Sequence, residues 1–534
     1  MPIELPNRSG FDMSHENLGT ASCGTLVPVL VDELLPNDTI SLGASFQVQL
    51  PPMATDFFGR VDYILEAFFV PSRLLWGGWQ SFMTHPTSAP QYPANTAVQG
   101  KSKYLPTLGL APDGASLASN TTGAGSLADY LGFKKPTDDT ASTGYVVNAL
   151  PFLAYHRIWD DWYRDSRIQA PLFYRPDELV QSLNLCNDVR FRPYTAGGVE
   201  APDQISTNEF ISNFSDGVNI ADLRQRNWAK DYYTTASTLP QAGNAATLEF
   251  DVQDDGVGNF SIAALRSANS LQKWLERNNI AGYKYSDQIY AQYGIYPSDA
   301  IMDRCIYLGR TSQNVYTRSV FQTSRAASSQ NLALNGNPFK TVGAKFGSSQ
   351  AVGEGSLVDN VRVTEHGFLM VLASLVPHAY YSTGVRRYLN RKVVGDIAFP
   401  LLSGMGDQAI MTSELHANSF GENSVFGYTD LYAEYKYHDD EVHGFLRDGE
   451  NLESFALQRS FVDAPELSSS FLQIPIDFMD QVFASTQRVA GYSCWYDIYF
   501  PYKKVSTLPE YSLPTLADLK NTHTKFISRG GKRL

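Results

Sequence analysis

The chain has 534 residues, of which only 18% are charged and 13% are aromatic, and its formal net charge is −13. The negative charge excludes a protein that binds nucleic acid over its whole surface, and 40 Gly and 28 Pro beside many aromatics favour strands and turns over solvated helices. So low a charged fraction in so long a chain indicates that partners cover much of the surface.

The N-terminal stretch "MPIELPNRSGFDMSHE" contains no apolar run of the kind found in a secretory signal. No apolar run approaches the ~20 residues that a membrane-spanning helix needs. The four cysteines stand far apart and form no CxxC pair, which argues against a zinc ribbon or a dithiol redox site. We therefore expect a soluble protein without membrane insertion, made in a reducing cytosol.

Residues 25–70 are predicted to form strands. "FQVQL" alternates apolar and polar residues, and "VDYILEAFFVP" places Val61, Tyr63 and Leu65 on one face. "SRLLWGGWQSFM" follows as a short helix or turn. Residues 86–148 are rich in Gly, Ser, Thr and Pro, and a loop of this length in a compact domain indicates an insertion with a functional or partner-bound surface.

A helix near residues 151–167 is predicted from "LPFLAYHRIWDDWYRD". Pro151 suits a first helical turn, where its missing N–H would have no partner anyway, and the aromatics follow at helical steps. Five aromatics exceed the usual need of one core, so we interpret this as a packing helix, in the core or at a subunit boundary, and not as a catalytic or metal site. The candidates for subunit packing or interface contacts are Trp76, Trp79, Phe152, Tyr155, Trp159, Trp162 and Tyr163.

The rest of the chain alternates irregular and regular segments. Residues 171–260 are turn-rich and are predicted to be an insertion, whereas "SIAALRSANSLQKWLERNN" predicts a helix near 261–278. Residues 308–363 are polar and rich in Gly, and we expect a further insertion there. Strands return within 364–505, at "GFLMVLASLVP", "DLYAEYKYHD" and "WYDIYFPYKKV".

These elements predict one domain over residues 1–534. Strands lie at both ends of the chain, so the first and the last strands must pair with one another. Distant strands that interleave in two antiparallel sheets are typical of Greek-key connections. We therefore predict a mainly β fold: a single eight-stranded antiparallel jelly roll, a β-sandwich, with long loop and helical insertions.

No catalytic, cofactor or metal site is predicted. The chain contains no GxSxG, HExxH or GxxxxGK[ST] motif. "DVQDDGVGNFSI" resembles a calcium loop but has Ile262 where a bidentate Glu is required. In "HDDEVH", a strand would turn His438 and His443 to opposite faces, which prevents both from binding one ion. We therefore expect no enzyme.

The tail over residues 517–534 is basic, and "KNTHTKFISRGGKRL" contains no acidic residue. Such a tail either stays solvated or neutralises nucleic-acid phosphates without reading sequence. The candidates for DNA contact are Lys525, Arg529, Lys532 and Arg533.

A family likeness is carried by a series of segments spread along the chain. They include "FDMSHE", "LVPVLVDELLPND", "FFVPSRLLW", "GSLADYLGF", "NALPFLAYHRIWDDWYRD", "DYYTTASTLPQAG", "LRSANSLQKWLERNNIAGYKYSDQIYAQYGIYPSDA", "EHGFLMVLASL", "GDQAI", "VFGYTDLYAEYKY" and "LPEYSLP". They follow the family order from Gly10 to Pro514. The chain resembles the major capsid protein of the Microviridae, small icosahedral single-stranded DNA bacteriophages, and is most similar to the gokushovirus-like branch.

This resemblance implies a structural protein with no enzyme activity. It implies a single jelly roll whose copies form a T=1 icosahedral shell around a circular single-stranded DNA genome. The implied partners are other copies of the chain, the packaged DNA, a small basic DNA-binding protein, an internal scaffolding protein, a minor pilot protein and a host surface receptor. The protein would be made and assembled in the bacterial cytoplasm and reside in the virion.

A jelly-roll carbohydrate-binding or carbohydrate-active protein is the alternative. It would share the aromatic, loop-rich composition, but would have a compact concave site and remain a monomer or small oligomer.

Overall fold

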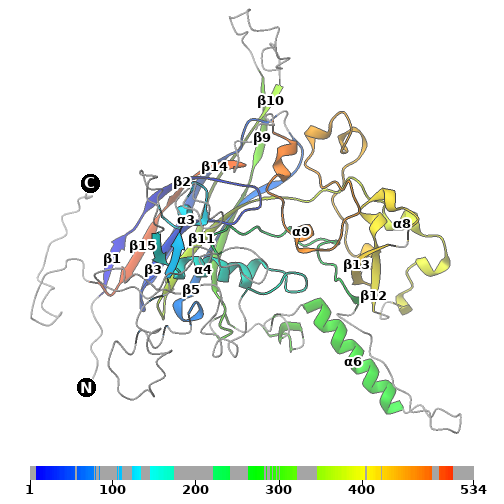
Figure 1. Ribbon diagram of the computed structural model, residues 1–534, viewed down its shortest axis with the longest axis horizontal. Coiled ribbons are helices and arrows are strands. Elements are labelled where there is room, and N and C mark those ends of the chain that lie inside the picture. Colours follow the sequence, from blue (N-terminus) through cyan, green and yellow to red (C-terminus); the bar gives the residue numbers. More distant parts are fainter. Residues whose placement is uncertain are drawn as a thin grey trace, which may run out of the picture.

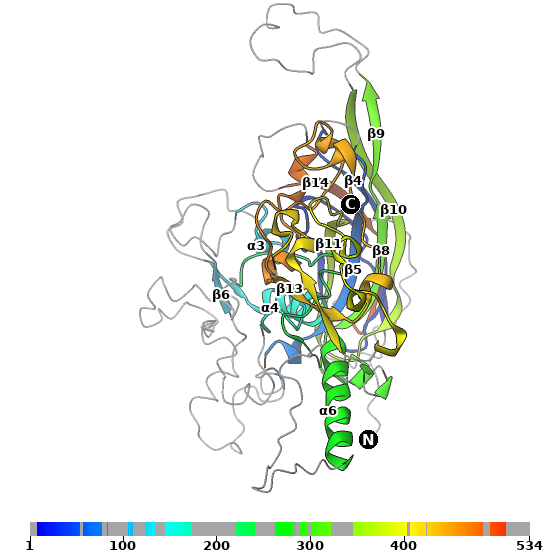
Figure 2. The same cartoon turned by 90° about the vertical axis from the view of Figure 1, so that its right-hand side faces the viewer.

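The computed structural model describes residues 8–53, 57–76, 79, 83, 105, 107–110, 123–133, 145–172, 220–240, 262–281, 284, 289–291, 293–295, 298–299, 301–321, 345–402, 406–422, 424–483 and 492–508. Two antiparallel sheets pack face to face, and the segments between their strands lie around them (Figures 1 and 2). Within this part of the chain, no helix combines the length and apolar character needed to cross a membrane.

The larger sheet joins strands from both ends of the chain. Its order is β1-β15-β4-β10-β9, and β14 lies between β2 and β4. Pro501 separates β14 from β15, as expected because proline has no N–H to donate to a ladder. The strands are β1 (Ser9–Asp12), β2 (His15–Ala21), β4 (Thr39–Gln49), β9 (Tyr316–Phe321), β10 (Lys345–Arg362), β14 (Cys494–Phe500) and β15 (Tyr502–Ser506).

The second sheet has its central strands buried on both faces. Its order is β3 (Val27–Leu34), β11 (Gly367–Pro377), β5 (Val61–Pro71) and β8 (Ile306–Asn314). Every residue of β5 and β11 is buried, which explains why both strands are mostly apolar, with Asp62 and Glu66 of β5 as the charged exceptions. One face packs against the larger sheet, and the other lies beneath a helix and its neighbouring loops.

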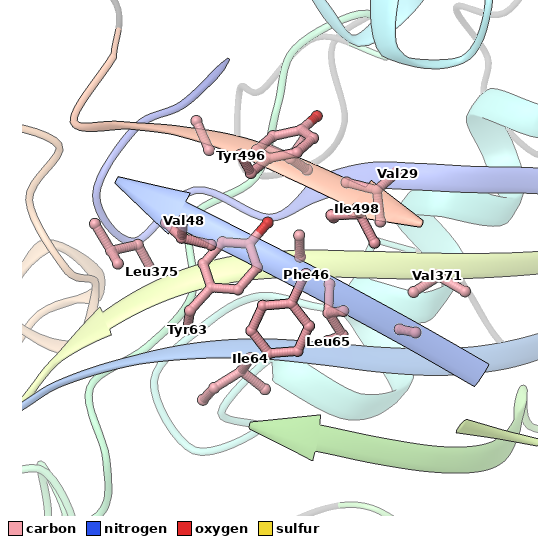
Figure 3. Close-up of a cluster of buried hydrophobic side chains, with 14 of the residues drawn as sticks. Val29, Phe46, Val48, Tyr63, Ile64, Leu65, Val371, Leu375, Tyr496 and Ile498 are labelled. Atoms are coloured by element: carbon pink, nitrogen blue, oxygen red, sulfur yellow. The ribbon is translucent and has the colours of Figure 1, made fainter. Parts of the chain in front are cut away.

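The core between the sheets is apolar and aromatic (Figure 3). Phe46 of the larger sheet lies 5.5 Å from Tyr63 of the second sheet, measured between ring centroids. Tyr63 in turn lies 6.4 Å from the ring of Tyr496. At about 1.5–3 kcal/mol for each fully buried large apolar side chain, contacts of this kind hold the two sheets together.

The predicted mainly β, antiparallel sandwich is confirmed. The two sheets contain eleven strands in the described residues, because β1–β2 and β14–β15 are interrupted. If each interrupted pair is taken as one long strand, nine strands remain, one more than the eight predicted, and N- and C-terminal strands interleave as expected.

One long connection, between β5 and β8, contains both predicted helices and two of the predicted insertions. The helix expected near 151–167 corresponds to α4 (Leu150–Ile158) followed by the π-helical turn η2 (Trp159–Tyr163), and that near 261–278 to α6 (Ile262–Ala281). Within 72–148 lie η1 (Ser72–Leu74), α3 (Leu127–Tyr130) and a small sheet of β6 (Thr107–Leu110) and β7 (Tyr145–Asn148). Most of 171–260, including the calcium-like "DVQDDGVGNFS", lies outside the described residues.

The expectation of an insertion over 308–363 is wrong where the structure describes it. Most of β8 and all of β9 and β10 lie there, and β10 is an 18-residue strand paired with β4. Two of its glycines are required by close neighbours, since a Cβ on Gly353 would stand 2.5 Å from the Phe46 ring. A Cβ on Gly355 would stand 2.3 Å from the Thr311 hydroxyl.

The chain between β11 and β14 folds beside the sandwich around a small core that it shares with Tyr232, Tyr233 and Ala236 (Figure 1). The predicted strand "DLYAEYKYHD" is wrong: Tyr432 has a left-handed backbone with φ of 64°, and a 3-10 turn follows it. This region contains α8 (Arg387–Asn390), η7 (Val394–Asp396), η8 (Pro400–Leu402), β12 (Asp407–Met411), η9 (Thr412–Glu414), η10 (Ala417–Ser419), β13 (Val425–Asp430), η11 (Ala433–Tyr435), η12 (Gly444–Leu446), η13 (Glu453–Phe455), α9 (Ser469–Leu472) and η14 (Phe478–Gln481).

Candidate functional site

The aromatic helix is a packing element inside the subunit. α4 and η2 lie on the outer face of the second sheet, where Phe152, Tyr155 and Trp159 are buried in an apolar cluster with Phe68 of β5 and Met370 of β11. The geometry accounts for so many aromatics, because one helix has to cover a sheet face that is itself apolar.

Each polar tip of these aromatics has a hydrogen-bond partner, as buried Tyr and Trp side chains require. The Tyr155 hydroxyl donates to the Leu26 carbonyl at 2.8 Å. The Trp159 Nε1–H donates to the Gln225 carbonyl at 3.0 Å, and the Trp162 Nε1–H donates to that of Cys305 at 2.9 Å. Each bond ties the helix to a different segment of the chain.

The remaining candidates lie near the same cluster. Trp76 is buried within it, whereas Trp79 is half-buried and its ring centroid lies 5.7 Å from that of His366. Trp162 and Tyr163 are also half-buried at the end of η2. A role at a boundary between subunits remains a prediction for the half-buried members, because the buried ones present no side-chain surface to a neighbour.

A buried ionic network joins the helix end to the sheet. Glu66 of β5 accepts a hydrogen bond from the Tyr163 hydroxyl at 2.6 Å and from Arg226 at 2.7 Å. The Arg226 guanidinium also lies 5.1 Å from the centroid of the Tyr163 ring and donates to the Ser374 hydroxyl at 3.1 Å. Burial first, and then the Glu66 charge, raise the pKa of Tyr163 well above its usual value, so its proton stays in place. The acid Glu66, in the middle of the otherwise apolar stretch "YILEAFFVP", was the available sequence signal for this network.

His156 is structural. Its ring is fully buried, with Nε2 2.9 Å from the Ile220 carbonyl oxygen and Nδ1 accepting from Arg224 Nε at 3.0 Å. Burial, and secondly the Arg224 charge, lower the pKa of His156 well below its usual value, so the imidazole is neutral. It donates through one nitrogen and accepts through the other, which leaves neither available for a metal.

The other candidates for chemistry give no reactive site in the described residues. Cys23, Cys305 and Cys494 are free thiols buried in the interior, and burial raises the pKa of Cys494 to about 12. His438 and His443 lie in an irregular segment, and His443 contacts Glu441 at 3.1 Å. Within the described residues, no group of three His, Cys, Asp or Glu side chains could hold a metal ion.

The described surface is rich in exposed large apolar side chains. Of the thirty-four that are exposed in the described residues, sixteen lie in the segment between β11 and β14, which contains about a third of those residues. Where exposed apolar side chains gather into one patch, they mark an interaction site in a soluble protein. The basic-tail candidates, Lys525, Arg529, Lys532 and Arg533, lie outside the described residues.

A family model described as "Capsid protein (F protein)" matches residues 3–516 of this sandwich with its large connecting segments. The chain belongs to this phage capsid protein family. The capsid protein is 25% identical over 607 residues to "Capsid protein VP1" of Chlamydia phage 1, with 97% of each chain covered. It is also 25% identical over 514 residues to "Capsid protein VP1" of Bdellovibrio phage phiMH2K, with 89% of each chain covered. To "Capsid protein VP1" of Spiroplasma virus 4 it is 22% identical over 569 residues, with 95% of each chain covered.

The family confirms the resemblance seen in the sequence. Chlamydia phage 1 and Bdellovibrio phage phiMH2K are gokushoviruses of the Microviridae. The capsid protein is therefore a structural component of a virion and not an enzyme, and the carbohydrate-binding alternative is set aside.

Proposed function

We propose that copies of this capsid protein assemble into a T=1 icosahedral shell that encloses a circular single-stranded DNA genome. The observation that carries the proposal is the family match over residues 3–516, with capsid-protein relatives that align over nearly their whole length. Assembly would take place in the cytoplasm of the bacterial host, where the chain is made.

The distribution of apolar residues supports closed assembly. The β-sandwich buries its own apolar faces, yet the segment beside it keeps many large apolar side chains exposed. Obligate interfaces between subunits are apolar and extensive, like a domain core cut in half. Closed point-group symmetry repeats each contact at every equivalent position, so contacts of modest strength together stabilise a shell.

DNA contact is proposed for the basic tail. The chain as a whole carries a net charge of −13, whereas the last fifteen residues contain five Lys or Arg and no acid. Such a tail can neutralise phosphates of a packaged single strand independently of its sequence. We further propose, from the family, an internal scaffolding protein, a small basic DNA-binding protein, a minor pilot protein and a host surface receptor as partners.

Sedimentation velocity and electron microscopy of the full-length chain, expressed with the other virion proteins, test the shell. Closed particles of uniform size are expected, and a species no larger than a small oligomer under all conditions would refute the proposal. For DNA, particles with residues 520–534 deleted are expected to protect less genome from nuclease. The matched variant changes only Lys525, Arg529, Lys532 and Arg533 to Gln, and normal packaging by both would refute a role for the tail.

A further inference from the structure

The segment from Arg386 to Leu402 exposes its apolar residues to an unusual extent. It lies in the region between β11 and β14, near α8 in Figure 1. Leu401 is 94% exposed and Val394 is 72% exposed. The exposed large apolar residues of the segment are Tyr388, Leu389, Val393, Val394, Ile397, Phe399, Leu401 and Leu402.

The arginines of the same segment point inward. Arg387 forms an ion pair with Glu414 at 3.0 Å, although Glu414 is buried, and Arg391 pairs with Glu434 at 3.0 Å. Arg386 pairs with Glu441. Each of the three arginine side chains is only 21–25% exposed. The usual distribution of a surface segment, with charges outward and apolar groups inward, is therefore reversed.

This reversal is fixed by the fold. Turning the apolar side chains inward would pull the arginines away from partly buried carboxylates and leave those carboxylates without their partners, which is unfavourable. The Asp396 carboxylate accepts hydrogen bonds from the backbone N–H of Lys392 at 2.7 Å and of Val393 at 3.0 Å. The segment therefore has a preorganised shape, which reduces the conformational entropy lost when a partner docks.

We propose that the outward side of residues 388–402, here the apolar flap, is a contact surface for a second copy of this capsid protein. This inference rests on the proposed shell. Eight side chains at these exposures present on the order of 800 Å² of mostly apolar area, the share of one partner in a standard interface and more than most monomers expose in one patch.

The charge distribution favours a protein neighbour over DNA. The arginines that would contact phosphates are engaged with Glu414, Glu434 and Glu441. Lys392 is the one exposed cation in the flap, and Asp396 lies next to it with the opposite charge. A nearly uncharged apolar surface is complementary to another apolar surface, and in a protein of this family the neighbouring subunit supplies it.

The first test compares particle assembly by flap variants. Val394→Asp with Leu401→Asp is expected to reduce the yield of closed particles at least tenfold, which corresponds to about 1.4 kcal/mol. The circular dichroism of the soluble subunit should stay unchanged, because both side chains are exposed in it. Leu401→Met keeps the site apolar and should assemble normally. Val352→Asp places a charge at an exposed valine of β10, outside the segment between β11 and β14, so an equal loss there would show a non-specific effect of charge and refute the assignment.

The second test measures burial in the particle directly. Leu401→Cys, in a chain with Cys186→Ser, offers an exposed thiol while Cys23, Cys305 and Cys494 stay buried. A maleimide should label it at least tenfold more slowly in particles than in free subunits. Equal labelling in intact particles would refute the flap contact and indicate a surface turned to another partner, while leaving the shell itself established. If the unmodified chain forms no oligomer at any concentration, the shell and the flap contact are both refuted.

Discussion

Replacement of Trp159 by Ala is expected to remove much of the free energy of unfolding of the subunit. The indole is only 2% exposed, and burial of roughly 200 Å² at ~25 cal/mol per Å² contributes about 5 kcal/mol. Truncation of a buried Trp to Ala costs about 3–5 kcal/mol, and loss of the 3.0 Å bond to the Gln225 carbonyl adds about 1 kcal/mol. The free energy of unfolding of an ordinary domain is only about 5–15 kcal/mol. A loss of this size would leave little folded subunit, so Trp159→Ala should abolish particle formation.

Urea unfolding of the subunit, followed by circular dichroism, measures the loss, and sedimentation of cell extracts measures particles. Trp159→Phe keeps an aromatic ring and loses the N–H, so it should cost about 1–2 kcal/mol and still give some particles. Trp274→Ala, at a half-exposed tryptophan of α6, is the matched control and should change the unfolding free energy by under about 0.5 kcal/mol. Normal virions from Trp159→Ala would show that the helix does not stabilise the subunit as argued.

Two further predictions concern buried charges. Because the pKa of His156 is lowered in the folded chain, the unfolded chain takes up a proton below about pH 6.5 and the folded chain does not. The unfolding free energy should therefore fall by up to ~1.4 kcal/mol for each pH unit below that value. Urea titrations at pH 7 and 5.5 measure this fall, which should be smaller in His156→Gln. Glu66→Leu leaves Arg226 buried without its carboxylate and should lower the unfolding free energy of the subunit by about 3–5 kcal/mol. The double variant Glu66→Leu with Arg226→Met should recover part of this loss. If the two substitutions have additive effects in a double-mutant cycle, the proposed coupling is wrong.

The sequence predicts those strands that are themselves rich in strand-forming residues. "GFLMVLASLVP" and "WYDIYFPYKKV" contain enough β-branched and aromatic residues to be read directly, and both are strands. β10 was not predicted as a strand, because the reason for its glycines lies in the residues that pack against it. Gly353 and Gly355 leave room for Phe46 and Thr311, residues far away in sequence, so a strand interior resembles a loop when read alone.

The packing role of the aromatic helix follows from periodicity, but its partners do not. Nothing local to Trp159 or Tyr163 identifies the Gln225 carbonyl or the Glu66 carboxylate, because those contacts join segments about 66 and 97 residues apart. The apolar flap was missed for a related reason. "RRYLNRKVVGDIAFPLL" has the composition of an ordinary amphipathic segment, and only the positions of Glu414 and Glu434 show that its arginines face inward.

The place of β14 in the larger sheet has a consequence for biosynthesis. β14 begins at Cys494, and within the described sheet it is the neighbour that β2 pairs with. At about 5–20 residues per second, a ribosome needs roughly 25–100 seconds to reach that residue, and until then the first strands of the nascent chain wait without a partner. A chain that stops before Cys494 therefore cannot complete its larger sheet, since β1 and β2 would lack the neighbours they pair with, and it would enter assembly as a defective subunit.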